Sequence, residues 1–249
     1  MATVGTEAFF PAFRKLVRAK MPFATFLIMR FVPGKAPEYL DIWHIADARL
    51  EVASGEYADS IYSFDPFFQF TDIPESGGLY RLPEIAPDRF FSSQYYLEYY
   101  RKTGLCDEVG LLAPMPSGCR AHLSISRSDE MGPFRRRELR CLKHHAPVML
   151  ELLTQHVTAI TPQEPLRLSA SSLPLADLIR THARDTLATH LTQREAQIAA
   201  LVLQGHSNGS AALVLDIAAQ TAKVHRRNLY RKLAISSQRD LFGLLKHLL

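Results

Sequence analysis

Basic side chains are concentrated in one short stretch near the end of the sequence, and their types and spacing suit the recognition of an anion. The stretch contains Lys223, Arg226, Arg227, Arg231 and Lys232. Residues 187–249 carry eight Lys and Arg against three Asp and Glu, a net charge of +5, whereas the other 186 residues carry 21 against 22, a net charge of −1. Positive charge on one short element is what binding to a polyanion requires. The alternative is a basic helix that is only solvated.

A second group of residues has the composition of a small-molecule site. A cavity between a sheet and helices is lined mainly by aromatic and apolar side chains, with a few polar anchors. The candidate ligand-binding residues are Trp43, Tyr62, Asp65, Phe67, Tyr95, Tyr99, Asp107 and Glu108. Carboxylates beside aromatic rings suit an amine or another cation. The alternatives are that the aromatic residues form the hydrophobic core and that Asp107 and Glu108 lie in a solvated turn.

The remaining reactive side chains do not form a catalytic or metal-binding pattern. Cys141 lies about one helical turn from His144 and His145, which is half of a zinc site, but no second such pair follows. The sequence contains no nucleophile elbow, phosphate loop or zinc-protease motif. We therefore expect no enzyme activity, no metal and no cofactor.

The composition is that of a globular protein with one or two domains. The chain has 249 residues, of which 47% are hydrophobic and 22% are charged. Three scattered cysteines do not suggest a disulfide framework and are typical of a reducing compartment. No apolar run reaches the roughly 18 residues that a membrane helix needs. We expect a cytoplasmic protein without a membrane partner.

The first 160 residues alternate between helical and strand patterns. Periodicity and turn residues predict helices at about 6–20, 65–71, 88–101 and from Pro133 to about Val157, and strands at 24–32, 39–46, around 111–113 and at 121–126. Strands flanked by helices predict an α+β fold, an α-β-α sandwich of the GAF or PAS kind. We expect residues 1–160 to form a ligand-sensing domain.

A proline- and serine-rich stretch separates this region from a helical one. The run TPQEPLRLSASSLPL predicts a linker, placed at residues 161–186. Thr192 and Glu195 form a capping box, Gly205 ends that helix, and Ser207 or Asn208 can cap the next. Helices at 219–233 and around a stripe of leucines then follow, with Leu241, Leu244, Leu245 and Leu248 on one face. Residues 187–249 are thus expected to form a four-helix domain.

The run LTQREAQIAALVLQGHSNGSAALVLDIAAQTAKVHRRNLYRKLAI resembles the helix-turn-helix domain of the LuxR family of bacterial transcription regulators. The matching positions are Leu191, Thr192, Arg194, Glu195, Ile198, Leu201, Gly205, Ser207, Asn208, Ala212, Leu215, Ile217, Thr221, Lys223, His225, Asn228, Lys232 and Leu233. The resemblance implies that the third of these helices enters the major groove of DNA. It assigns base edges to Lys223, Val224 and Arg227, and phosphates to Thr221, His225, Asn228 and Arg231.

The sequence departs from the family pattern at a few positions. Gly209 and Ser210 replace a lysine and a glutamate, and Ala222 replaces a larger aliphatic residue. Ala218 replaces the serine that caps the recognition helix, a loss that typically costs ~1 kcal/mol unless Asp216 provides a substitute. None of these changes removes a position assigned to DNA.

The N-terminal region departs from two kinds of sensory domain known in the LuxR family. It lacks the acidic pair of a phosphorelay receiver. Asp65-Pro66 matches acyl-homoserine-lactone receptors, but Glu56 and Val52 stand where those receptors have tyrosine and tryptophan. The segments YSFDPFFQF and SSQYYLEYYRKTGLCDEVGLL resemble the GAF-like sensory domain of orphan LuxR-type regulators.

We therefore expect a DNA-binding transcription regulator whose N-terminal domain senses a small molecule, an amine or an aromatic compound. Its expected partners are a double-stranded DNA operator, the effector, a second copy of the chain and, for an activator, RNA polymerase. The dimer is expected to use the leucine stripe of the last helix and the long helix at about 133–160. The alternatives are a lactone quorum-sensing receptor, a constitutive DNA-binding dimer, and an enzyme-like GAF module with a targeting domain.

Overall fold

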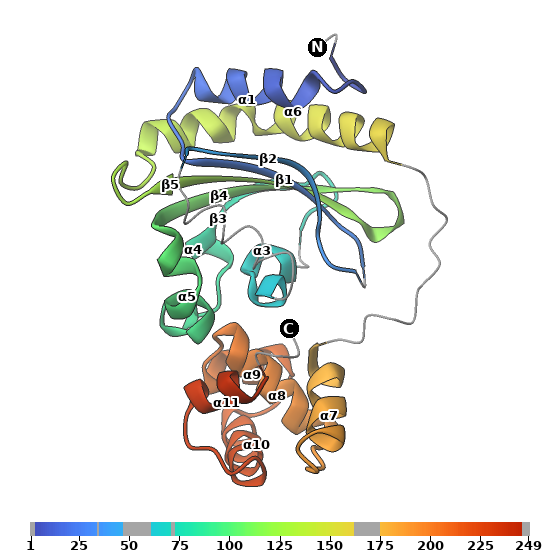
Figure 1. Ribbon diagram of the computed structural model, residues 1–249, viewed down its shortest axis with the longest axis vertical. Helices are drawn as coiled ribbons and strands as arrows, with labels where there is room; N and C mark the ends of the chain where they lie inside the picture. The colour runs from blue at the N-terminus through green and yellow to red at the C-terminus, as the bar shows by residue number, and fades with distance from the viewer. Residues whose placement is uncertain (1–2, 34, 47–60, 71–72, 162–174, 246–249) are drawn as a thin grey trace. The chain divides into compact units, whose positions relative to one another are not determined.

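The computed structural model of the chain describes residues 3–33, 35–46, 61–70, 73–161 and 175–245 (Figure 1). The chain divides into two compact units. The sheet unit comprises Met1–Ser54, Phe70–Ile85 and Thr103–Ser169, and the helical unit comprises Gly55–Gln69, Ala86–Lys102 and Ala170–Leu249. The chain thus passes twice from the sheet unit into the helical unit and back before it enters the C-terminal helices.

The sheet unit is built on a five-stranded antiparallel sheet. Its strands are β1 (Thr25–Phe31), β2 (Glu38–His44), β3 (Gly78–Arg81), β4 (Leu105–Pro114) and β5 (Arg120–Ser128). The order across the sheet is β2-β1-β5-β4-β3. The Pro-Ser-Gly turn η4 (Pro116–Gly118) joins β4 to β5, and the pairing of these strands puts Leu111 opposite Leu123. Two long central strands therefore form the base on which the rest of this unit packs.

Helices α1 (Phe9–Arg18) and α6 (Arg136–Ile160) form a layer on one face of the sheet (Figure 1). Alternate strand residues such as Ile28, Leu111 and Leu123 point into this layer and are completely buried. They pack in one core with Phe13 of α1 and Leu153 of α6. This burial stabilises the unit and fixes which side chains face the opposite side of the sheet.

Within the described residues, the helical unit contains two short segments and five C-terminal helices. The short segments are η1 (Ile61–Phe64) with α3 (Pro66–Gln69), and η2 (Phe90–Ser92), α5 (Gln94–Glu98) and η3 (Tyr100–Thr103), whose last residue belongs to the sheet unit. The C-terminal helices are α7 (Leu175–Asp185), α8 (Gln193–Gln204), α9 (Asn208–Val214), α10 (Ala219–Lys232) and α11 (Gln238–Leu245). Helices α8, α9 and α10 form the helix-turn-helix arrangement, and α11 packs against α8.

The α+β class expected from the sequence is confirmed, with local differences. The pattern did not predict β3 or the short α4 (Leu82–Ile85), and the helices expected at 65–71 and 88–101 are shorter and broken. Helix α7 lies inside the range expected to be linker. This segment is helical because Ala176, Ile179 and Ala183 form a buried stripe at helical spacing. The domain boundaries at 160 and 187 otherwise stay predictions.

The leucine stripe of the last helix is used within the helical unit. Leu241 and Leu245 are buried, and Phe242 contacts Phe64 with 6.0 Å between ring centroids. Leu244 is half-buried, and Leu248 lies outside the described residues. The stripe therefore offers less free apolar surface to a second copy than its sequence suggests, because the bundle itself covers it.

Candidate functional site

The first helix of the helix-turn-helix region is fixed at both ends by its own sequence. Thr192 Oγ1 accepts a hydrogen bond from the Glu195 backbone N–H at 3.3 Å, and Glu195 Oε2 accepts one from the Thr192 N–H at 2.8 Å. This is the expected capping box. The helix ends at Gly205, whose φ of 95° lies in the left-handed region that favours glycine. Ser207 then caps α9 by accepting from the Ser210 N–H at 3.2 Å.

An ion pair ties the end of the recognition helix to the start of α8. Lys232 Nζ lies 2.7 Å from Glu195 Oε2 and also donates to the His190 carbonyl oxygen at 3.1 Å. Burial would raise the pKa of Glu195, but hydrogen bonds from Lys232 and Thr192 outweigh it and hold the pKa below its usual value. Lys232, although basic and adjacent to the DNA-binding candidates, is therefore a positioning residue.

Arg226 has a similar structural role where α10 meets α9. Its guanidinium donates to Asn208 Oδ1 at 3.4 Å and to the Tyr230 hydroxyl at 3.0 Å, and it lies over the Tyr230 ring. These contacts connect α10 to the start of α9. Of the five basic residues between 223 and 232, Arg226 and Lys232 are thus engaged in contacts inside the unit, and the other three are exposed.

Three exposed cations of α10 lie on one side of the helix. Lys223, Arg227 and Arg231 are four residues apart and exposed, while Ala222 and Leu229 are buried on the opposite side. Thr221 is also exposed, and the other candidates Val224, His225 and Asn228 are half-buried. The structure therefore brings the seven predicted DNA-binding residues together on one helix, with the longest donors outermost.

Recognition helix α10 begins without a side-chain cap. Ala218 has the extended N-cap conformation (φ −66°, ψ 143°), and its methyl group cannot accept a hydrogen bond. We expect Ala218→Ser to stabilise α10 by about 1 kcal/mol, because a serine hydroxyl at this position can accept from the second or third N–H of the helix. Hydrogen exchange of peptides from 219–232, measured by mass spectrometry, should slow by about fivefold. The control is Ala219→Ser, one residue inside the helix, which should give no such slowing.

The turn between α8 and α9 has partners that sequence reasoning missed. The Ser207 backbone N–H donates to Asp88 Oδ1 at 2.9 Å, and the Arg89 N–H donates to the Gly205 carbonyl oxygen at 2.9 Å. A side chain at Gly205 would lie 2.8 Å from the Phe90 Cα. Burial would raise the pKa of Asp88, but the Ser207 hydrogen bonds lower it overall. In the sequence, Gly205 was the one residue that could indicate this contact, because the close approach of Phe90 requires a residue without a Cβ atom.

Trp43 is placed away from the other ligand-binding candidates of the sheet unit. It lies on β2 on the side facing α1, where its ring contacts Phe23, and the guanidinium groups of Arg14 and Arg18 lie 5.6 and 4.6 Å from its centroid. Its interactions are those of a packing residue at the edge of the helix-covered face. The structure thus gives no support to Trp43 as the wall of a ligand site.

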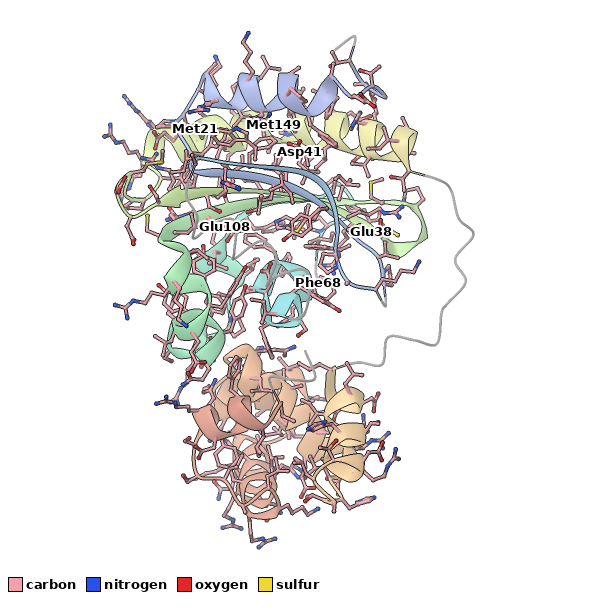
Figure 2. The ribbon with its side chains drawn as sticks, in the orientation of Figure 1. Met21, Glu38, Asp41, Phe68, Glu108 and Met149 are labelled. Atoms are coloured by element: carbon pink, nitrogen blue, oxygen red, sulfur yellow. The ribbon has the colours of Figure 1, made fainter. Side chains whose placement is uncertain are left out.

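Asp107 and Glu108 lie in strand β4 and not in a turn, and both are buried. Asp107 Oδ2 accepts from Arg81 at 2.8 Å and from the Phe134 backbone N–H at 2.9 Å, which makes it a structural carboxylate. Glu108 points to the opposite face, away from α1 and α6, whereas Met149 of α6 lies on the helix side (Figure 2). The solvated-turn alternative is therefore wrong. Because adjacent residues of a strand point to opposite faces, Asp107 and Glu108 have different surroundings.

Buried polar side chains gather on the face of the sheet that carries Glu108, beside apolar ones such as Leu112 and Phe31. Glu108 Oε1 accepts from the Ser124 hydroxyl at 2.6 Å, and Ser126 and His122 lie on the same side of β5. All four side chains are buried. These polar side chains are where a buried ligand could find hydrogen-bonding partners in the sheet unit.

The other candidates lie in the helical unit. Asp65 Oδ1 accepts from the Phe67 backbone N–H at 2.8 Å and so begins α3. Tyr95 and Tyr99 are one turn apart near α5, with ring centroids at 5.5 Å, and Tyr62 contacts Phe68. Glu56 and Val52, the positions that argued against a lactone receptor, lie outside the described residues. In the described part of the chain, no group of three or more His, Cys, Asp or Glu residues is arranged to hold a metal ion.

Comparison with known proteins decides the family. The model of the family "Bacterial regulatory proteins, luxR family" matches residues 189–244. Beyond this region, the chain is 31% identical over 190 residues to an HTH-type transcriptional regulator encoded in the exeN 3′ region of Aeromonas salmonicida, which covers 74% of this chain and 95% of that protein. The chain belongs to the LuxR family of bacterial regulatory proteins. The LuxR-type regulator therefore binds DNA through the helix-turn-helix, as its sequence predicted.

Two further proteins are similar to this LuxR-family regulator over part of its length. It is 45% identical over 64 residues to the transcriptional regulator MalT of Cronobacter sakazakii, covering 26% of this chain but 6% of MalT. The structure of the VqsR LBD domain from Pseudomonas aeruginosa covers 59% of the regulator and 86% of that chain, with a TM-score of 0.50 and 20% identity. The second likeness shows a shared fold. None of the helices in the described residues is long and apolar enough to cross a membrane.

Proposed function

We propose that this LuxR-family regulator reads its operator with α10, through base-edge contacts of Lys223, Val224 and Arg227. Thr221, His225, Asn228 and Arg231 hold phosphates on either side. The observation that carries this proposal is the single exposed side of α10, where long donors remain free of the contacts that engage Arg226 and Lys232. An arginine can hold guanine O6 and N7 with two hydrogen bonds, so Arg227 supplies base discrimination.

The operator has two half-sites, and two copies of the regulator occupy it. One helix-turn-helix contacts only a short stretch of DNA, and symmetric operators match a two-fold protein. Sedimentation velocity with a selected operator duplex tests this. A complex with two copies of the chain is expected, and a one-to-one complex at saturating protein would contradict it.

The sheet unit controls operator binding by taking up a small molecule on the face that carries Glu108. A buried carboxylate next to the Ser124 hydroxyl suits an effector with an amine or another hydrogen-bond donor. An effector can act only by binding the DNA-competent state and the other state with different affinities.

Native mass spectrometry of the regulator purified from its own cells tests the sensor proposal. A retained small molecule is expected in the parent protein, and Glu108→Gln should lose it while operator affinity without effector stays within about twofold. Glu84→Gln, an exposed acid of the same unit, is the matched control. A parent protein that carries no small molecule, and whose DNA affinity does not respond to a panel of amines, would favour the constitutive dimer.

A further inference from the structure

Exposed cations line the first three turns of α6, far from the recognition helix in sequence. Arg135, Arg136, Arg137, Arg140 and Lys143 are all exposed. The carboxylate within this stretch, Glu138, is buried and already accepts from Arg127 at 3.2 Å and from the Arg135 backbone N–H at 2.7 Å. The next carboxylate along the helix is Glu151. The start of α6 therefore presents positive charge that its own helix does not neutralise.

These cations occupy the least favourable end of the helix. The N-terminus of a helix carries a partial positive charge, so acidic residues stabilise it and basic residues oppose it. Arg135, Arg136 and Arg137 stand at the N-cap and the first two helical positions. Their placement does not favour the helix, and so stability alone does not account for it.

Helix α1 does not extend this group of cations. Its basic residues Arg14 and Arg18 face β2, where Arg14 pairs with Asp41 at 2.9 Å and Arg18 lies over the Trp43 ring. Helix α6 instead packs over β3, β4 and β5, toward the other edge of the sheet. We call Arg135, Arg136, Arg137, Arg140 and Lys143 together the α6 patch. The nearest opposing contact is the long one between Lys143 and Glu84, at 3.9 Å between exposed groups.

The chemistry of the α6 patch favours nucleic-acid phosphates. Most of its cations are guanidinium groups, which match phosphate oxygens with paired hydrogen bonds. From residue 135 to residue 145 the exposed side chains are Arg, Lys and His, without the aromatic or aliphatic centre that a protein interface has. A membrane-binding helix would likewise expose an apolar face beside its basic one.

We propose that the α6 patch is a second, sequence-independent contact of this regulator with duplex DNA, formed by the sheet unit. It supplies affinity through counterion release and leaves the reading of sequence to α10. DNA beyond the operator is therefore bound by a surface other than the recognition helix.

The test measures binding of a labelled mixed-sequence duplex of about 50 base pairs, by fluorescence anisotropy across a salt series. The triple variant Arg136→Gln, Arg137→Gln, Arg140→Gln is compared with Lys35→Gln, Arg101→Gln, Lys102→Gln, which removes the same charge from exposed sites outside the patch. Each lost phosphate contact should flatten the slope of log K against log salt by about 0.9 and weaken binding about fivefold near 0.15 M salt. The control variant should match the parent.

Equal affinities and slopes for the two triple variants would overturn the proposal. So would a patch variant that loses binding to vesicles of anionic phospholipid while its DNA slope stays that of the parent. Misfolding is not a competing explanation, because removing cations from this helix end should leave the unfolding transition reported by Trp43 unchanged or raise it. Sequence preference, measured separately by selection from random duplexes, should stay intact in the patch variant, so this proposal can fail while the assignment of α10 stands.

Discussion

Replacing Lys223 or Arg227 by alanine is expected to weaken binding to the operator by about 1–3 kcal/mol, which is roughly a fivefold to 150-fold loss of affinity. Both side chains are exposed on α10, outside the contacts by which Arg226 and Lys232 hold the helix in place, so the fold should persist. Sequence preference at the contacted base pair should relax as well. The measurement is selection from random duplexes by the full chain, followed by affinity titration of the selected sequence.

Two further substitutions separate base reading from other effects. Arg231→Ala should weaken binding about equally for all sequences and flatten the salt slope by about one, because a phosphate contact carries no sequence information. Arg226→Ala should loosen α10 against α9, since its guanidinium bonds to Asn208 and Tyr230. If the Lys223 and Arg227 variants both keep the sequence preference of the parent, the assignment of these residues to base edges is wrong.

The parts of the fold that local sequence determines were predictable. The apolar period of α1 and α6, the alternation of Leu123 and Ile125 along β5, and the capping box at Thr192 each depend on residues a few positions apart. The recognition helix was predictable for a different reason. Its residues match a family pattern, and the structure then shows which of the basic ones stay exposed.

The sensor residues were less predictable because their partners come from distant strands. The pair Asp107-Glu108 suggested a solvated turn, since two adjacent acids are uncommon in a buried strand. Arg81 and Ser124, which pair with them, are brought there only by the sheet register. The short edge strand β3 has no buried residue, so it lacks the period that would reveal it. Helix α7 follows a proline- and serine-rich run that masked its start.

A pH titration should show that the sheet unit loses stability in acid through His122. This residue lies on β5 with no exposed surface, and burial, assisted by the charge of Arg120, lowers its pKa from 6.5 to about 3. As the pH falls below about 6.5, the unfolded chain binds this proton while the native chain does not. The stability that neutral His122 contributes to the native state is therefore fully present above this pH and is lost as the pH falls towards 3. His156, whose pKa burial also lowers, acts in the same direction.

Between pH 6 and pH 4 this single group should lower the free energy of unfolding by about 2.5 kcal/mol, close to 1.4 kcal/mol per pH unit at the acid end. Trp43, the one tryptophan of the chain, lies in β2 and reports on the sheet unit by fluorescence during denaturant titration. His122→Gln should flatten the dependence of unfolding free energy on pH whatever it does to stability at neutral pH, whereas His144→Gln, at an exposed site on α6, should retain it. A slope that is the same in the His122 variant and the parent would show that the buried imidazole is not the group that takes up the proton on unfolding.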